Sequence, residues 1–274
     1  MNLYVNLRDF KETLGAQDGG KGVDERDAAF LRVLEASSRG IDEMCQRPFF
    51  PVTATKTFDT NGENIWWIPA GTPDLLSVTA LTVDDNDDGV FNIALVENTD
   101  YRLLPYNESP KRALQIVSRS NLISALPRAD FCLRIAGRWG YTEDTELVTT
   151  TAEALDASET GVDFTVADPL ISAGDTIVID SEDMYVSASI AGTLTVQRAV
   201  NGTTAATHAN PSNVYRRRYH RDIEEACRAQ SVRWWREAAS ANISAQGGEF
   251  GYQFATLYPA IRDMLARHQR IGVG

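Results

Sequence analysis

The acidic residues of this chain are concentrated in one internal segment. Residues 142–215 contain twelve acidic residues and a single base, Arg198. The segments 1–141, 142–215 and 216–274 contribute −5, −11 and +4 to the total formal charge of −12. Because so abrupt a change of composition is typical of a domain boundary, we predict two domains. One consists of residues 1–141 together with 216–274, and the other is an inserted domain of residues 142–215.

The acidic segment has the pattern of a β domain. Short alternating runs lie between Gly-containing turns at residues 163–166, 176–179, 184–187, 193–197 and 213–215. They predict an all-β domain, sandwich- or barrel-like. Inserting such a unit into a loop costs little when the two ends of the insert stay close together.

The flanking segments show a mixture of helical and strand patterns. Apolar or small residues recur every three or four positions in residues 24–46 and 222–239, and Pro259 suits the first turn of a last helix that ends near Arg270. Between residues 53 and 136 the runs are short and rich in β-branched and aromatic residues. The predicted fold class is α+β: a helical bundle with a small antiparallel sheet, plus the inserted domain.

Composition narrows the class of protein further. The 274 residues are 43% hydrophobic and 23% charged, which is typical of a globular chain, and no segment approaches the roughly 20 apolar residues of a membrane span. Residues 1–8 lack a basic region followed by an apolar one, so we expect no secretion by the general route, and the three cysteines, Cys45, Cys132 and Cys227, are far apart. These features predict a reducing compartment and no contact with a membrane.

Motifs for catalysis or cofactor binding give no positive signal. Residues 84–89 match the first half of a calcium loop, but Leu95 stands where the closing glutamate belongs, so we expect a solvated turn between strands. The three histidines, His208, His220 and His268, do not have a recognised zinc spacing. We therefore expect no enzyme activity, no cofactor and no metal.

One basic cluster follows the acidic segment. Arg216, Arg217, Arg218 and Arg221 are candidates for contact with DNA or with another subunit. An equal alternative is a solvated junction where the chain leaves the β domain and enters a helix. Because so acidic a segment precedes them, the arginines could also be internal or intersubunit ion-pair partners. A DNA-binding regulator would depend on this cluster alone, and the net negative charge argues against a conventional duplex binder.

The order of segments resembles a known family. The segments that carry this resemblance are Tyr4-Val-Asn-Leu-Arg-Asp-Phe-Lys11, residues 27–42 and 47–49, Leu75-Leu-Ser-Val-Thr79, the Asp-rich turn ending in Gly89, Asp100-Tyr-Arg-Leu103, Ala136-Gly-Arg-Trp-Gly-Tyr141, Asp222-Ile-Glu-Glu-Ala226, the Trp-Trp helix and the Pro-initiated last helix. Together they resemble the head-tail connector (adaptor, or head completion) proteins of tailed bacteriophages over about 200 residues. The acidic segment departs from the family's short form, which has only a few residues at that place, and itself resembles a β unit of phage structural proteins.

The resemblance implies a structural virion protein, made in the host cytoplasm and located in the neck. Such adaptors form a ring, typically a dodecamer, beneath the portal after genome packaging, and the ring extends the DNA channel without reading DNA sequence. Its partners would be further copies of itself, the portal protein and a stopper or tail-completion protein. The family's C-terminal part tends to engage the portal, which makes Tyr258, Arg262, Arg267 and Arg270 candidate portal contacts.

Two alternatives stay open. The first is a tail-side or stopper component of the neck. The second, from another class, is a surface protein that binds a glycan or receptor through the inserted domain, although that domain has only Phe164, Tyr185 and Tyr215 as aromatic residues.

Overall fold

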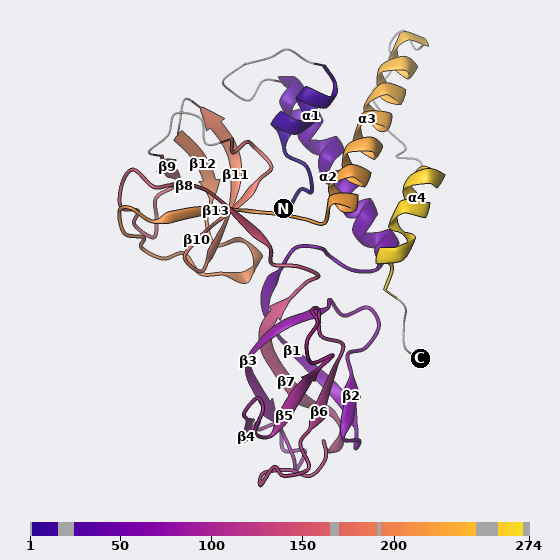
Figure 1. Ribbon diagram of the computed structural model, residues 1–274, viewed down its shortest axis with the longest axis vertical. Coiled ribbons are helices and arrows are strands. Elements are labelled where there is room, and N and C mark those ends of the chain that lie inside the picture. Colours follow the sequence, from indigo (N-terminus) through magenta and orange to yellow (C-terminus); the bar gives the residue numbers. More distant parts are fainter. Residues whose placement is uncertain (1, 16–24, 165–169, 191–192, 245–256, 271–274) are drawn as a thin grey trace. The chain divides into compact units, whose positions relative to one another are not determined.

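The chain forms two compact units (Figure 1). The structure, a computed structural model, describes residues 2–15, 25–164, 170–190, 193–244 and 257–270. Unit 1 comprises Met1–Cys45 and Asp144–Gln269, and unit 2 comprises Gln46–Glu143 and Arg270–Gly274. The described residues include thirteen strands, four α-helices and two short 3-10 helices. The predicted domains, 1–141 with 216–274 and 142–215, stay a prediction.

Unit 2 is built from two antiparallel sheets. The first has the order β1-β7-β3-β4 and the second has the order β2-β6-β5. The strands are β1 (Val52–Asn61), β2 (Ile65–Trp67), β3 (Leu75–Val83), β4 (Ile93–Leu95), β5 (Tyr101–Leu104), β6 (Ala113–Ile116) and β7 (Arg128–Trp139). One hydrophobic core draws on both sheets, for example Leu133 and Ile135 from β7 and Leu114 from β6, with Trp139 fully buried.

The described strands of unit 1 all lie after residue 143. Six strands form one antiparallel sheet of order β8-β13-β10-β11-β12-β9. They are β8 (Thr145–Thr150), β9 (Gly161–Asp163), β10 (Thr176–Ile179), β11 (Glu182–Ile190), β12 (Thr193–Gln197) and β13 (Asn213–Arg217). A bridge between Thr151 and Phe164 joins the two edge strands, so that the sheet closes into a small barrel around fully buried residues such as Ile177 and Val214.

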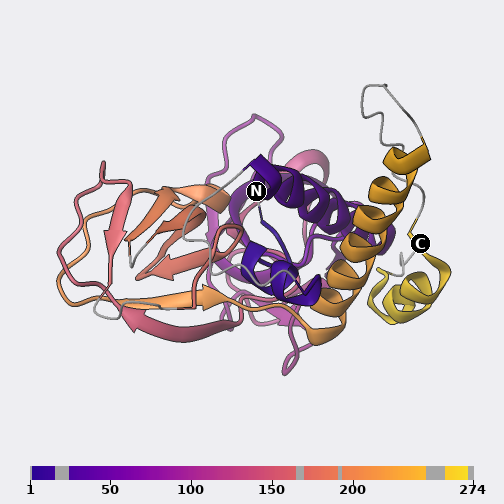
Figure 2. The same ribbon diagram turned by 90° about the horizontal axis from the view of Figure 1, so that it is seen from above.

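The helices of unit 1 come from both ends of the chain (Figures 1 and 2). They are α1 (Leu7–Thr13), α2 (Glu25–Cys45), α3 (Arg221–Ser244) and α4 (Pro259–Leu265), which continues into the 3-10 helix η2 (Ala266–His268). Most of the predicted apolar positions are buried, for example Leu34 and Ile41 of α2 and Ile223 of α3, whereas Ala28 of α2 is exposed. The rings of Phe30 and Trp235 meet edge to face at 4.5 Å between α2 and α3.

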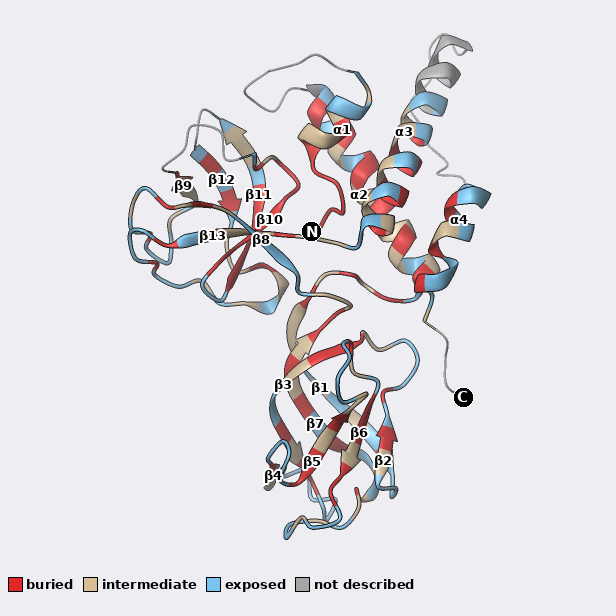
Figure 3. Ribbon diagram, in the orientation of Figure 1, coloured by how far each residue is buried: buried red, intermediate tan, exposed pale blue. Residues whose placement is uncertain are grey.

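The predicted fold class, a helical bundle with a small sheet, is wrong. The described residues contain thirteen strands in three antiparallel sheets and only four α-helices, of which α1 and α4 have seven residues each. Buried residues run through the strands of both units as well as the helices (Figure 3). Two long helices have a strong period, whereas nine of the thirteen described strands have only three to six residues and give a weak one, so the sequence pattern overstated the share of helix.

A glycine at the centre of the first sheet explains part of the Ala136-Gly-Arg-Trp-Gly-Tyr141 motif. Gly137 lies in β7 between β1 and β3, and a methyl group there would overlap the carbonyl oxygen of Ser77. Gly140 has φ of 153° and packs as closely against the backbone of Phe50. The two glycines therefore permit the close approach of neighbouring chain segments.

We expect Gly137→Ala to destabilise unit 2 by about 1–3 kcal/mol or more, because neighbouring backbone must move to make room for the methyl group. The matched control is Gly161→Ala, since a Cβ at that strand glycine meets no atom within 4 Å. Differential scanning calorimetry of both variants measures the effect. Equal melting temperatures for the two would contradict the packing argument.

Candidate functional site

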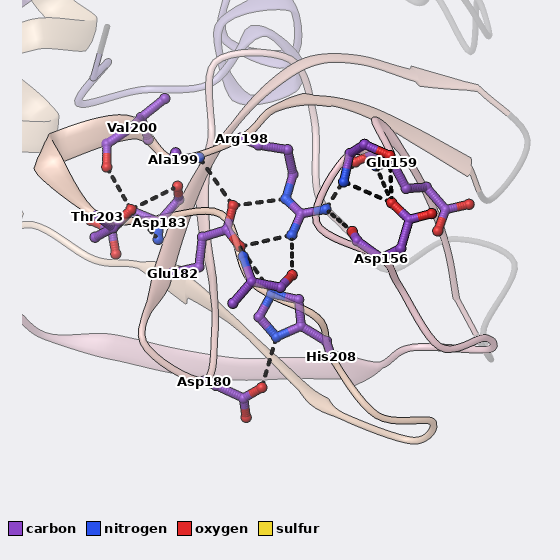
Figure 4. Close-up of polar contacts among 12 residues, drawn as sticks. Asp156, Glu159, Asp180, Glu182, Asp183, Arg198, Ala199, Val200, Thr203 and His208 are labelled. Atoms are coloured by element: carbon purple, nitrogen blue, oxygen red, sulfur yellow. Dashed lines mark hydrogen bonds and ion pairs between the residues drawn. The ribbon is translucent and has the colours of Figure 1, made fainter.

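A buried polar network surrounds Glu182, the first residue of β11, just after the turn that joins it to β10 (Figure 4). Arg198 donates to the Glu182 carboxylate through Nε at 2.7 Å and Nη2 at 2.8 Å. The backbone amides of Ala199 and Ala206 donate to the same carboxylate, each at 3.0 Å, and Nε2 of His208 lies 3.0 Å away. Every oxygen of this fully buried carboxylate is thus engaged.

The electrostatic state of Glu182 follows from those contacts. Burial alone would raise its pKa, but the hydrogen bonds from Arg198, Ala206, His208 and Ala199 outweigh burial and lower the pKa of Glu182 to about 2. The other ring nitrogen of His208, Nδ1, lies 2.7 Å from the carboxylate of Asp180. The network therefore holds an ionised carboxylate inside the barrel.

Arg198 also ties loops together. Its Nη1 donates to the carbonyl oxygens of Asp156 at 2.8 Å and Glu159 at 2.9 Å, and its Nη2 donates to that of Ala206 at 2.6 Å. The one base of the acidic segment is thus the centre of its polar core. Sequence reasoning missed this role, because composition shows that Arg198 is alone but not that it is buried.

The basic cluster 216–221 is largely paired within unit 1. Arg217 is 6% exposed and lies 2.7 Å from Asp183. Arg216 lies 3.0 Å from Glu146, and Arg218 lies 3.7 Å from the same carboxylate. These contacts favour the internal ion-pair alternative, while Arg221 is exposed at the start of α3. A contact of the four arginines with DNA or another subunit stays a prediction.

The predicted portal residues lie in different places. Tyr258 and Arg262 line a pocket of about 310 Å³ between α3 and α4, whose walls also include Gln230, Trp234 and Leu257. The guanidinium of Arg233 stacks 4.0 Å from the Tyr258 ring centre, and Tyr258 is 43% exposed. Aromatic and arginine side chains at such a surface are typical of protein contacts.

Arg270, the fourth predicted portal residue, belongs to unit 2. Its side chain is only 11% exposed, its Nε lies 3.9 Å from Asp74, and its Nη2 donates to the carbonyl oxygen of Ile68 at 3.3 Å. Asp74 also pairs with Arg47 at 3.4 Å, and burial raises the pKa of Asp74. Arg270 therefore contacts its own unit.

Two of the histidines meet a carboxylate in unit 1. Nε2 of His268 and Nδ1 of His220 lie 3.1 and 3.6 Å from Oδ2 of Asp222, and the two rings are 4.7 Å apart. Arg267 lies 3.0 Å from the same oxygen and is 67% exposed. Although the histidines have no recognised zinc spacing along the chain, the fold brings these two together. Spacing could not reveal it, since the contact joins the start of α3 to the end of η2.

The Asp-rich turn lies between β3 and β4, as expected. The buried Asp84 carboxylate accepts the backbone amides of Asn86 at 3.3 Å, Asp87 at 2.9 Å and Gly89 at 2.7 Å. Its oxygens thus stabilise the turn itself.

Among the described residues, every helix is too short or too polar to cross a membrane.

Comparison with known proteins gives one weak likeness. No protein-family model matches the chain, and no curated protein sequence matches it. The match is to a solved structure of the neck of an empty GTA particle, computed with C6 symmetry. The alignment covers 99% of this chain and 93% of the matched chain, with a TM-score of 0.43 and 12% sequence identity. A likeness at that level carries no argument about fold or function.

Removing Arg217, a buried arginine of the basic cluster, should cost far more stability than removing Arg221, an exposed one. We expect Arg217→Ala to destabilise unit 1 by about 3–5 kcal/mol, because Asp183 keeps a buried charge without this partner. The control Arg221→Ala should change stability by less than about 0.5 kcal/mol. Urea unfolding followed by circular dichroism tests both, and a similar small loss for each would contradict the structural role of Arg217.

The Glu182 network should make stability depend on pH. Since the folded pKa of about 2 lies below the ordinary 4.5, the stabilisation is present above pH 4.5 and is lost as pH falls through that value toward 2. It amounts to about 3 kcal/mol at most. Unfolding measured from pH 7 to pH 3 should show the wild type losing stability below pH 4.5, whereas Glu182→Gln, already destabilised at pH 7, should show a shallower decline. Parallel curves would contradict this assignment.

Proposed function

We propose that the protein is a structural component of the neck of a tailed phage or phage-like particle. In this role it is a head-tail adaptor: copies form a ring, dodecameric in the family it resembles, beneath the portal. The ring extends the DNA channel and offers a docking surface to a stopper or tail protein. No enzymatic step belongs to this function.

The observation that carries the proposal is the meeting of the adaptor-like helices from the two ends of the chain. Cys227 of α3 lies 3.5 Å from the hydroxyl of Ser38 in α2, buried between the two helices. Near the C-terminal end of α2, the side chain of Gln269 donates to the carbonyl oxygen of Met44 at 3.2 Å. Segments that resemble one family, although more than 180 residues apart, thus form one packed layer.

Exposed apolar side chains on unit 2 support an assembling role. Large hydrophobic residues with about half or more of their surface exposed lie in its strands, turns and loops: Trp67, Val90, Val96, Tyr106, Leu122 and Phe131. Trp67 is exposed while its neighbour Trp66 is buried, as the alternation of a strand predicts. Side chains of this kind are typical of surfaces that become buried between subunits.

The α3–α4 pocket is the surface that we assign to the portal. It places Tyr258 and Arg262 beside Arg233, and Arg267 is exposed farther along, in η2. An aromatic ring flanked by arginines suits a partner surface that is acidic at its rim. DNA needs no specific contact in this arrangement, because acidic residues along a channel repel phosphate and leave DNA mobile.

The test mixes the purified chain with the portal protein and follows assembly by analytical ultracentrifugation and negative-stain electron microscopy. We expect a ring on the portal, and we expect the double variant Tyr258→Ala/Arg262→Ala to weaken its binding at least tenfold, since anchor residues typically contribute about 2 kcal/mol or more each. Arg32→Ala, an exposed arginine on α2, is the matched control and should bind normally. A chain that ignores the portal but binds a tail protein or a glycan would contradict the adaptor assignment in favour of one of the alternatives.

A further inference from the structure

The cluster of His220, Asp222 and His268 places three metal-type donors at one point. His220 precedes α3, Asp222 lies in its first turn, and His268 ends η2. His268 is buried, Asp222 is partly buried and His220 is exposed, so that one side of the cluster faces solvent. Within the described residues, one ligand atom from each lies within 4.8 Å of the other two.

The distances suit a small coordination sphere. A zinc ion bound to nitrogen and oxygen at about 2.0–2.1 Å in a tetrahedron separates its ligands by about 3.3–3.4 Å. The two measured edges to Oδ2 of Asp222 are 3.1 Å from His268 and 3.6 Å from His220. The third edge, between the two imidazole nitrogens, is within 4.8 Å, so binding would draw the two rings toward a common ion.

The hydrogen bonds of the cluster are compatible with ligation. The backbone amide of Asp222 donates to Nδ1 of His220 at 3.3 Å, so this nitrogen is unprotonated, and a metal would take its lone pair in place of that amide. Oδ2 of Asp222 accepts a hydrogen bond from Nε2 of His268 at 3.1 Å. A metal would displace the proton that Nε2 of His268 shares with that carboxylate.

We infer that His220, Asp222 and His268 bind one divalent transition-metal ion of the zinc type. Two imidazoles and one carboxylate are ligands that such ions prefer, whereas magnesium and calcium favour oxygen alone. With three protein ligands the solvent-facing position is left to water. The ion links the end of η2, and with it α4, to the start of α3. The site does not depend on the proposed function.

Arg267 is the competitor for this site. Its guanidinium lies 3.0 Å from the Asp222 oxygen that would ligate the ion. Because the side chain is 67% exposed, it can turn into solvent when a metal binds. Removing the arginine should therefore tighten binding, whereas a purely structural ion-pair cluster has no reason to take up metal in its absence.

The test is calorimetric titration of the full, tag-free chain with zinc chloride in a non-chelating buffer. We expect one saturable site, a dissociation constant at least about tenfold weaker for His220→Gln and for Asp222→Asn, and tighter binding for Arg267→Ala. The control Asp263→Asn changes an exposed carboxylate of α4 and should bind as the wild type does. His220 is half exposed, so its variant should stay folded.

A second readout identifies the ligands. Cobalt(II) in place of zinc should give the visible absorption of a low-coordinate nitrogen and oxygen site, and His220→Gln should lose it. Zinc should also raise the melting temperature of the wild type but not that of Asp222→Asn. Absence of saturable binding, or binding and spectra unchanged by both variants, would overturn the inference.

Discussion

The ion pair between Arg198 and Glu182 is the interaction on which unit 1 most depends. A carboxylate with no exposed surface is tolerated only when charge and hydrogen bonds compensate for the water it has lost, and here two guanidinium contacts, two backbone amides and an imidazole do so. The same guanidinium donates to three loop carbonyls. One buried pair thus fixes both the start of β11 and the loops around it.

The N-terminal segment depends in turn on the barrel. Asn2 exchanges hydrogen bonds with Asn201 and accepts one from Thr176, and Asn6 donates to the buried carboxylate of Asp175 at 3.2 Å. Burial raises the pKa of Asp175 to about 6 despite the backbone amide of Ser172 and the nearby Arg216. The barrel is therefore joined to the rest of unit 1 by side-chain hydrogen bonds from the start of the chain as well as by its two ends.

How far the sequence predicts this structure differs between its parts. The helical period located α2 and α3 and their buried faces, because twenty or so residues repeat one pattern. Short strands between residues 53 and 136 and in the acidic segment were expected, but their share of the fold was underestimated beside the two long helices. The histidine pair was missed because contact between residues 220 and 268 arises from tertiary packing, for which spacing along the chain carries no signal.

Acidic and basic residues that lie in separate segments of the sequence form ion pairs in the fold. The acidic segment 142–215 and the basic stretch that follows it meet through Arg216 with Glu146 and Arg217 with Asp183. Asp183 is fully buried, and so is Glu182, which Arg198 neutralises. Part of the acidity that dominates the composition is thus absent from the surface. Because only exposed charges can contact another molecule, the total charge of −12 is a poor guide to what the protein binds.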